Sequence, residues 1–288
     1  MIELFQYLSR LKSINLDLCS KLTNSMFFTP IRECLVLSEI RTESTNLGVE
    51  ESTTELVIDP RIKSLHLTWN GNLSDKFMKK VAFVCPNLQL LNVSDCRIIT
   101  EEGICKILKS CGEIQCLRIE QCRHINSLRI KHFEVKKLVV LQVGASGIDN
   151  DTLITIANTC PRLLYLNLSC CIYVTTRGVK EVVEKFTALR EILLYFCQNV
   201  NANILLGIVF SMPSLRNIGW PYDEDISFPV YGIFDSIMVT NFGVVPLLRK
   251  LTNVTKIDLS GNKSITDKSI ASILRNSQSL RFGGAMSC

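Results

Sequence analysis

Apolar and polar residues alternate within a nine-residue unit that recurs along this chain. In the copy that runs from Leu88 to Cys96, apolar residues stand at unit positions 1, 4 and 6, and a cysteine stands at position 9. Clear copies cover residues 11–19, 62–70, 88–96, 114–122, 163–171, 189–197 and 254–262. Alternation with a period of two residues over so short a run predicts a half-buried β-strand in each unit.

Between the units the apolar residues change to a helical period. They are spaced i, i+3, i+4, i+7 at Ile104, Ile107, Leu108 and Cys111, again at Val179, Val182, Val183 and Phe186, and again at Leu205, Ile208, Val209 and Met212. This spacing is typical of an amphipathic helix. An apolar residue and a capping residue precede each expected helix, at 73–74, 99–100, 148–149, 174–175, 200–201 and 265–266. A cap side chain accepts a hydrogen bond from an unpaired backbone N–H, so these pairs support the helices independently.

The strand units repeat at a regular step. The steps from Leu88 to Ile114 and from Leu163 to Leu189 are both 26 residues, and we assign degenerate copies at Arg32, Leu138 and Leu215. With a last copy at 280–288 there are eleven units, each too small to fold alone but able to share a core with its neighbours. The pattern predicts a cysteine-containing leucine-rich-repeat solenoid of the α/β class. We expect one domain over 1–288, a right-handed horseshoe with parallel strands on the concave face and helices on the convex face.

The repeat register also makes predictions about the ends and the irregular parts of the solenoid. The stripe positions before the first unit are Met1, Leu4, Phe5 and Leu8, and the last unit stops at residue 288, so we expect a solenoid that is incomplete at both ends. The step from Leu215 to Val254 is 39 residues, which predicts an insertion loop at 223–242. Residues 39–60 are rich in Ser, Thr and Glu and keep almost no helix stripe, and we expect them to be extended or mobile.

Most of the thirteen cysteines occupy positions that the repeat explains. Nine of them end strand units or close helix stripes, where a free thiol behaves as a small apolar side chain: Cys19, Cys96, Cys122, Cys171, Cys197, Cys288, Cys85, Cys111 and Cys160. A zinc site is the alternative, but no C-x-x-C pair occurs, so we expect neither a metal site nor a cofactor. A thiol-rich, odd count favours a reducing compartment, the cytoplasm or the nucleus.

Charge and hydropathy limit the classes of partner. Part of the net charge of +5 lies between Arg118 and Lys137. An acidic or phosphorylated partner is the functional interpretation, and a solvated surface is the more frequent structural one. Only Phe133 could stack on bases there, which makes nucleic acid an unlikely partner. No apolar run reaches the ~18–20 residues of a membrane span, so we expect no membrane partner.

The chain offers little for catalysis. Its three histidines are His66, His124 and His132, and no catalytic triad order, metalloprotease pair or phosphate-binding loop surrounds them. We therefore expect no enzymatic activity and no catalytic residue.

Binding residues are expected where the repeat leaves side chains free. Residues at unit positions 3, 5 and 7 face the concave surface because strand side chains alternate. We select as partner-binding candidates His66, Arg118, Glu120, Gln142, Tyr165, Asn167, Glu191 and Tyr195. Arg118, Tyr165 and Tyr195 are the expected anchors, since Arg and Tyr dominate interface hot spots. The alternative is that these residues only form the polar surface that any such solenoid has.

Together the motifs resemble one known family. The strand unit ending in Cys, the Ile-Thr or Val-Thr cap, Gly103 and Gly178, and the Cys-Pro pairs at 85–86 and 160–161 are similar to the repeats of F-box/LRR proteins, especially those of plants. The resemblance implies a substrate receptor of an SCF ubiquitin ligase, in which an F-box docks on the Skp1 adaptor and the repeats hold the protein to be ubiquitinated.

The resemblance also sets conditions on that function. No F-box precedes Leu11 in this sequence, so Skp1 is an expected partner only if an F-box is present upstream. The expected role is a protein-interaction module that binds a protein substrate on the concave face. The alternative is a leucine-rich-repeat fragment of an intracellular immune receptor, or a scaffold unrelated to ubiquitin.

Overall fold

The computed structural model describes residues 8, 10–49, 56–128, 130, 134–200, 204, 208, 211–212, 214–215 and 217–219. The predicted insertion at 223–242, the units at 254–262 and 280–288, and most of the first helix stripe lie outside these residues.

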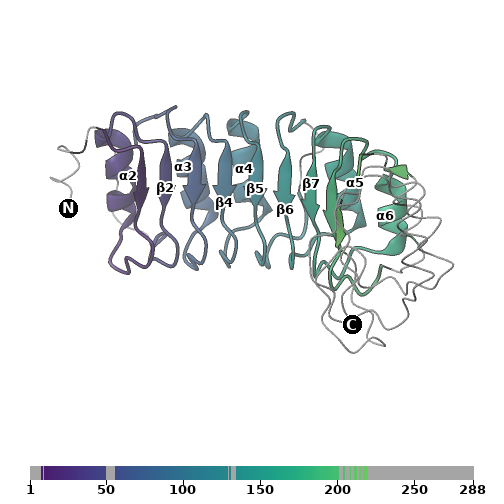
Figure 1. The fold of residues 1–288 in the computed structure, drawn as a ribbon. Coiled ribbons are helices and arrows are strands. Elements are labelled where there is room, and N and C mark those ends of the chain that lie inside the picture. Colours follow the sequence, from purple (N-terminus) through teal and green to yellow (C-terminus); the bar gives the residue numbers. More distant parts are fainter. Residues whose placement is uncertain are drawn as a thin grey trace, which may run out of the picture.

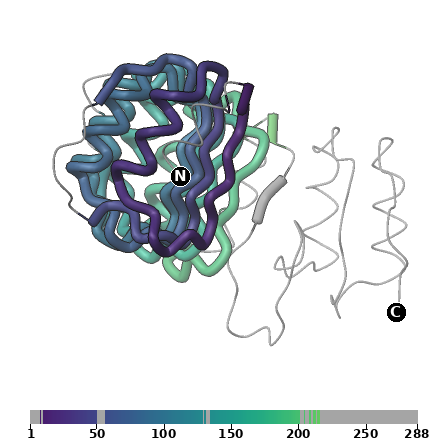
Figure 2. The backbone as a smooth tube through the Cα atoms, turned by 90° about the vertical axis from the view of Figure 1, so that its left-hand side faces the viewer, coloured from purple at the N-terminus to yellow at the C-terminus, as the bar shows by residue number. Residues whose placement is uncertain are grey.

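Nine short parallel strands form one sheet in sequence order. They are β1 (Ser13–Asn15), β2 (Glu39–Arg41), β3 (Ser64–His66), β4 (Leu90–Asn92), β5 (Cys116–Arg118), β6 (Val140–Gln142), β7 (Tyr165–Asn167), β8 (Glu191–Leu193) and β9 (Asn217–Gly219). Figure 1 shows the strands side by side along one face of the molecule, with the helices behind them. In Figure 2 successive turns of the chain stack in one coil. The predicted leucine-rich-repeat solenoid is confirmed.

The strands pair in register at every repeat. Leu65 of β3 is aligned with Leu91 of β4, and Leu91 with Leu117 of β5. These position-4 side chains are fully buried, as are the position-6 residues Leu67, Val93 and Ile119. Each repeat therefore adds one layer of aliphatic side chains to a continuous core, and burial of these layers is the main source of stability.

The structure corrects one predicted unit. The second strand unit begins at Leu37, not at Arg32, because Arg32 lies in helix α2 (Asn24–Glu33), whereas Ile40 is the buried centre of β2. Residues 39–60 were expected to be extended or mobile. Among the described residues 39–49 and 56–60 the structure has strand β2 and turns, and no helix.

In the described part of the chain, the helices with defined bounds that pack behind the sheet are α2, α3 (Asp75–Val84), α4 (Glu101–Ser110), α5 (Asn150–Thr159) and α6 (Thr176–Val182). The predicted stripe residues Ile104, Ile107, Leu108 and Cys111 are buried. Thr100, Asp149 and Thr175 cap their helices with side-chain hydrogen bonds, as predicted, and Thr23 does the same for α2. Ser74 stands at the expected cap position of α3 without a side-chain bond.

The first residue of a helix also fastens the start of the following repeat. The Asp75 carboxylate accepts hydrogen bonds from the Thr100 N–H at 2.9 Å and from the Thr100 hydroxyl at 2.6 Å. Asn150 repeats this at α6, where its Oδ1 accepts the Thr175 N–H at 2.9 Å. We call this contact the helix-start clamp. It joins neighbouring repeats on the side of the solenoid away from the sheet.

The buried cysteines make a second link between repeats. Cys96, Cys122, Cys171 and Cys197 each donate a thiol hydrogen bond, at 3.1–3.3 Å, to a backbone carbonyl of the previous strand unit. Burial raises the pKa of Cys122 and of Cys197 to about 12, which keeps both thiols protonated as donors. All twelve cysteines that the structure describes are free, in agreement with the prediction from the repeat register.

Candidate strand-face binding site

The exposed face of the sheet consists of positions 3, 5 and 7 of each unit, and we call it the strand face. In β3, β4, β5 and β6 the middle residue is buried and the two outer residues are partly exposed. Side chains at these outer positions therefore lie on the side of the sheet away from the helices, where a partner can reach them.

Three predicted candidates form one row across adjacent strands. Arg118 of β5 is aligned with Gln142 of β6, and Gln142 with Asn167 of β7. All three stand at position 5 of their units. The sequence period alone brings them together, because equivalent positions in an in-register sheet are neighbours.

Glu120 reaches across a whole repeat to join this row. Its Oε1 accepts a hydrogen bond of 2.7 Å from the Asn167 Nδ2, although the two residues belong to units separated by another unit. The intervening unit has Gly144 at position 7, and a Cβ there would lie 3.4 Å from the Glu120 Oε1 and 3.6 Å from the Asn167 Nδ2. These are ordinary van der Waals distances, and the closest approach of such a Cβ would be 3.1 Å, to the Ser169 carbonyl oxygen.

Electrostatics at Glu120 are set mainly by burial. Burial raises the pKa of Glu120, while the neighbouring Arg118 guanidinium and the Asn167 hydrogen bond oppose this shift. The site therefore holds a partly desolvated carboxylate beside a guanidinium.

Tyr165 and Glu191 extend the group toward the C-terminal end. Tyr165 is aligned with Glu191 of β8, and its hydroxyl accepts a hydrogen bond from the Gln142 Nε2 at 3.4 Å. Burial raises the pKa of Tyr165, so its phenol is neutral at physiological pH. Tyr195 stands at position 7 after β8 and is partly buried. Arg118, Glu120, Gln142, Tyr165 and Asn167 thus form one connected group, with Glu191 and Tyr195 beside it.

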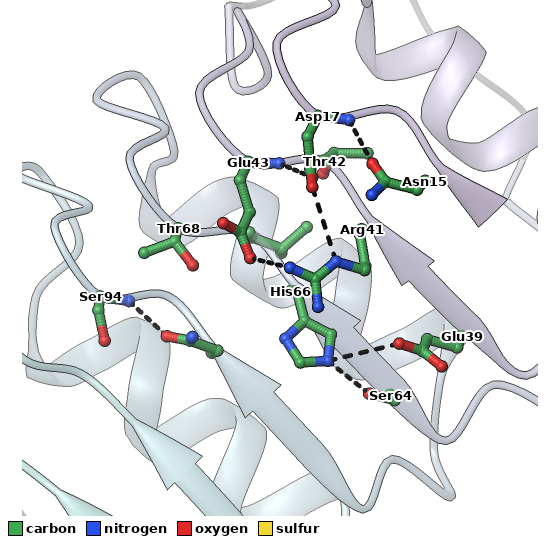
Figure 3. Close-up of polar contacts among 12 residues, drawn as sticks. Asn15, Asp17, Glu39, Arg41, Thr42, Glu43, Ser64, His66, Thr68 and Ser94 are labelled. Carbon is green, nitrogen blue, oxygen red and sulfur yellow. Dashed lines mark hydrogen bonds and ion pairs between the residues drawn. The ribbon is translucent and has the colours of Figure 1, made fainter. Parts of the chain in front are cut away.

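His66 belongs to a separate group nearer the N-terminus. Its Nε2 lies 3.1 Å from the Ser64 Oγ and 3.7 Å from a carboxylate oxygen of Glu39 on β2. Burial lowers the pKa of His66, and the Arg41 guanidinium lowers it further, so the imidazole is neutral at pH 7. Figure 3 shows this side chain beside Ser64 and Glu39.

The N-terminal group contains residues that sequence reasoning missed. Arg41 bonds the Glu43 carboxylate at 2.9 Å and lies 3.6 Å from Asp17, as Figure 3 shows. The incorrect start at Arg32 hid Glu39, Arg41 and Glu43, because a unit over 32–40 places Glu39 at position 8 and leaves Arg41 and Glu43 outside. A step of 26 residues from Leu11 to Leu37 would have found them.

Unpaired polar atoms concentrate on the strand face. Among the described residues, four buried side-chain nitrogen or oxygen atoms have no hydrogen-bond partner, and three of them belong to Thr68, Arg118 and Ser169 at strand-face positions. The fourth is the Thr42 hydroxyl at an inward position. Because buried polar groups are normally paired, this concentration indicates a surface whose hydrogen-bonding capacity the chain itself does not use.

The basic segment between Arg118 and Lys137 lies mostly away from this face. Lys137 pairs with Glu113 at 2.6 Å, Lys136 lies 3.6 Å from Glu134, and Arg123 and His124 are exposed. Residues 129 and 131–133 of this segment, including His132, lie outside the described residues. Whether it binds an acidic partner stays a prediction.

Two kinds of feature are absent from the described part of the chain. It has no group of three or more His, Cys, Asp or Glu side chains arranged to hold a metal ion. Among the helices in that part, none has the length and apolar character needed to cross a membrane.

Comparison with known proteins supports the repeat assignment. The family model described as "Leucine Rich repeat" matches residues 84–108 and 250–274. Two solved structures are similar at low identity. The leucine-rich repeat-containing protein LegL7 from Legionella pneumophila is 13% identical with a TM-score of 0.47, over 89% of this chain and 95% of that one. A chain of the yeast Rad7 and Elc1 complex is 14% identical with a TM-score of 0.42, over 97% and 81%.

Curated relatives include F-box proteins. F-box/LRR-repeat protein 4 from Bos taurus is 23% identical over 216 residues, 74% of this chain and 29% of that protein. F-box protein SKIP1 from Arabidopsis thaliana is 24% identical over 153 residues, 46% of this chain and 51% of that protein. The chain thus spans about half the length of one relative and less of the other. Its similarity to F-box/LRR proteins, which the strand and cap motifs indicated, is confirmed.

Proposed function

We propose that this chain is a non-catalytic protein-interaction solenoid that holds a protein substrate for an SCF ubiquitin ligase. The observation that carries the proposal is the concentration of unpaired polar atoms at Thr68, Arg118 and Ser169 on one face. Similarity to two F-box proteins supports the link to ubiquitination. A cytoplasmic or nuclear location belongs to the same proposal, and the twelve free cysteines support it.

The proposal divides the work between two parts. The strand face contacts the substrate, with Arg118, Tyr165 and Tyr195 as anchors, because large side chains with mixed polar and apolar character carry most interface energy. In F-box proteins the F-box is the module that docks on Skp1, so ligase assembly depends on that module and not on the strand face. Substrate binding and ligase assembly should therefore be separable by mutation.

The test joins the whole chain to an F-box placed before Met1. We expect the fusion, but not the chain alone, to retain Skp1 in a pull-down. In cells treated with a proteasome inhibitor, mass spectrometry of ubiquitin remnants then identifies the proteins that the fusion modifies. Substituting Arg118, Tyr165 and Tyr195 together by Ala should reduce these remnants at least about tenfold, the effect of losing a small hot-spot cluster.

A matched control removes one arginine and two aromatic side chains that lie away from the strand face. Phe83 and Tyr173 are exposed aromatics, and Arg177 on α6 is exposed. Replacing these three by Ala should leave both Skp1 capture and the remnants unchanged. Both triple variants should first be shown to keep the wild-type melting temperature. The proposed division is then contradicted if both variants reduce the ubiquitin remnants equally, or if the strand-face variant does not reduce them.

A further inference from the structure

We propose that the N-terminal part of the strand face, formed by Asp17, Glu39, Arg41 and Glu43, binds a lysine- or arginine-containing segment of the partner protein. We call these four residues the acidic patch. This inference rests on the proposed function, in which the strand face is the binding face. It adds the chemistry of the segment that binds there.

The strand face has the opposite charge to the chain as a whole. Over the eight units from Leu11 to Cys197, positions 3, 5 and 7 contain five carboxylates, two guanidiniums and no lysine. That is a net of three negative charges on one face of a chain whose net charge is +5. The carboxylates are Asp17, Glu39, Glu43, Glu120 and Glu191, and the guanidiniums belong to Arg41 and Arg118. A field of one sign on one surface attracts and orients a segment of the other sign.

The acidic patch holds the largest share of this charge in a fixed arrangement. The Asp17 Oδ1 accepts the Glu43 backbone N–H at 2.8 Å, so the Asp17 side chain is tied to the next repeat. Arg41 bonds Glu43 at 2.9 Å and lies 3.6 Å from Asp17. One guanidinium therefore serves two carboxylates, and Glu39 adds a third that lies 3.7 Å from the His66 Nε2. Because the neutral imidazole does not balance Glu39, the patch keeps a net negative charge.

A buried hydroxyl beside the patch gives independent evidence that it is built for a ligand. Thr68 follows β3 at position 7, next to Glu43 in the neighbouring unit, and the two units are joined there by the Ser44 N–H to Thr68 carbonyl bond of 3.0 Å. Thr68 is only 8% exposed, and its Oγ1 has no hydrogen-bond partner. Figure 3 shows its side chain beside the Glu43 carboxylate. A hydroxyl in this position can accept a hydrogen bond from an incoming ammonium or guanidinium group.

The chemistry of the patch suits a side-chain cation. Carboxylates accept charge-assisted hydrogen bonds from Lys and Arg, and pairs of carboxylate oxygens match the planar guanidinium fork. Glu39 and Glu43 stand at positions 3 and 7 of one unit, on either side of Arg41, so cations entering along the strand meet a carboxylate on both sides of it.

The test measures binding of defined peptides to the full chain. Three labelled peptides of equal length alternate glycine with lysine, glutamine or glutamate, and fluorescence anisotropy gives their Kd at about 50 mM and about 300 mM salt. The lysine peptide should bind most tightly and weaken with salt. Asp17→Asn, Glu39→Gln and Glu43→Gln together should raise its Kd at least about tenfold at low salt, since three ionic contacts are removed. These substitutions keep the oxygen acceptors that hold the loop.

The matched control removes three carboxylates elsewhere. Glu102→Gln, Glu181→Gln and Glu184→Gln neutralise exposed residues outside the strand face, and we expect them to change the Kd less than about twofold. Equal weakening by both triple variants would overturn the inference, because the effect would then follow net charge alone. Tighter binding of the glutamate peptide would also overturn it.

The outcomes also separate this inference from the proposed function. If the acidic-patch variant binds the lysine peptide normally while the Arg118, Tyr165 and Tyr195 variant still loses its ubiquitinated proteins, the partner chemistry is wrong and the receptor role stands. If the strand-face substitutions leave ubiquitination unchanged but the patch still selects the lysine peptide, the receptor role is wrong and the patch stands as a basic-segment binding site.

Discussion

At the scale of single residues, Glu120 shows how the strand face combines structure with binding capacity. Its carboxylate accepts the Asn167 amide hydrogen bond at 2.7 Å and is half-buried beside Arg118. A buried charge lowers stability unless partners compensate, and burial raises the pKa of Glu120, so the ionised form of this carboxylate costs folding free energy. We infer that the Glu120 charge contributes to partner binding, whereas its hydrogen bond with Asn167 stabilises the fold.

Glu120→Gln should separate these two contributions. The glutamine Oε1 still accepts from Asn167, and no charge is buried, so we expect the free energy of unfolding at pH 7 to stay equal or to rise. Glu120→Ala should lower it by about 1–2 kcal/mol, because the Asn167 amide loses its partner. Urea denaturation followed by circular dichroism measures both.

The pH dependence of the same pair follows from the raised pKa of Glu120. Its folded-state pKa lies above the unfolded value, so the folded state binds the proton more tightly, and its stability relative to the Gln variant improves as the pH falls through the folded-state pKa. Any difference in favour of Gln at pH 7 should therefore shrink on acidification. A difference that grows on acidification would mean that hydrogen bonding, not burial, controls this carboxylate.

At the scale of secondary-structure elements, the helix-start clamp explains two glycines in the sequence motif. Gly103 and Gly178 stand three residues after the caps Thr100 and Thr175. A Cβ at Gly103 would overlap the Asp75 carboxylate, and one at Gly178 would overlap the Asn150 carboxamide. Glycine is needed there for close approach of the previous helix, not for an unusual backbone angle.

Gly178→Ala should therefore destabilise the chain despite the better helix propensity of alanine. Overpacking costs about 1–3 kcal/mol and the propensity gain is about 1 kcal/mol, which leaves a net loss. Gly112→Ala is the matched control, since a Cβ there meets nothing within 4 Å, and its effect should stay within about 0.5 kcal/mol. Thermal melting of both variants decides the matter, and an unaffected Gly178→Ala variant would contradict the clamp.

The elements also show what the sequence could and could not predict. Helix starts at Thr100, Asp149 and Thr175 could be predicted because a cap and its apolar stripe lie within one repeat. The Asp75 to Thr100 clamp could not, since it joins side chains 25 residues apart. The unit at Leu37 was missed for another reason. It ends in Thr45 instead of Cys, and no helix is described between β2 and β3, so neither flanking signal was present.

The candidate site divides in the same way. The row of Arg118, Gln142 and Asn167 follows from equal unit positions, which the sequence reveals directly. The bond from Glu120 to Asn167 does not follow from unit positions, because its two partners are 47 residues apart and belong to units separated by another unit. The repeat period predicts which residues lie on the strand face, but it does not predict which of their side chains form hydrogen bonds with one another.

At the scale of the whole molecule, the described helices and strands pack on those of adjacent repeats, and side-chain contacts such as the Glu120 to Asn167 hydrogen bond add a few longer links. Leu117 at the centre of β5 is fully buried and aligned with Leu91 and Leu141 on the two adjacent strands. Stability in such an array is a sum of repeat and interface contributions, so a defect should remain local before it spreads.

Leu117→Ala tests this local character. Removing the side chain should lower the free energy of unfolding by about 2–5 kcal/mol. Amide hydrogen exchange should show lost protection in β4, β5 and β6, with β1 and β2 close to wild type. Uniform loss of protection from β1 to β8 would instead show that the described repeats unfold as a single cooperative unit.

The in-register sheet also sets a length scale for anything that lies across it. Neighbouring strands are about 4.8 Å apart, whereas an extended peptide advances about 3.3 Å per residue, so the two periods do not coincide at each step. They come close to agreement when three peptide residues, about 10 Å, cross two repeats. Because the side chains of an extended peptide alternate between its two faces, a linear segment running along the solenoid would present the same face to equivalent positions at every sixth residue, about 20 Å or four repeats. Spacing in the partner's sequence, as well as its charge, would then determine how well it fits.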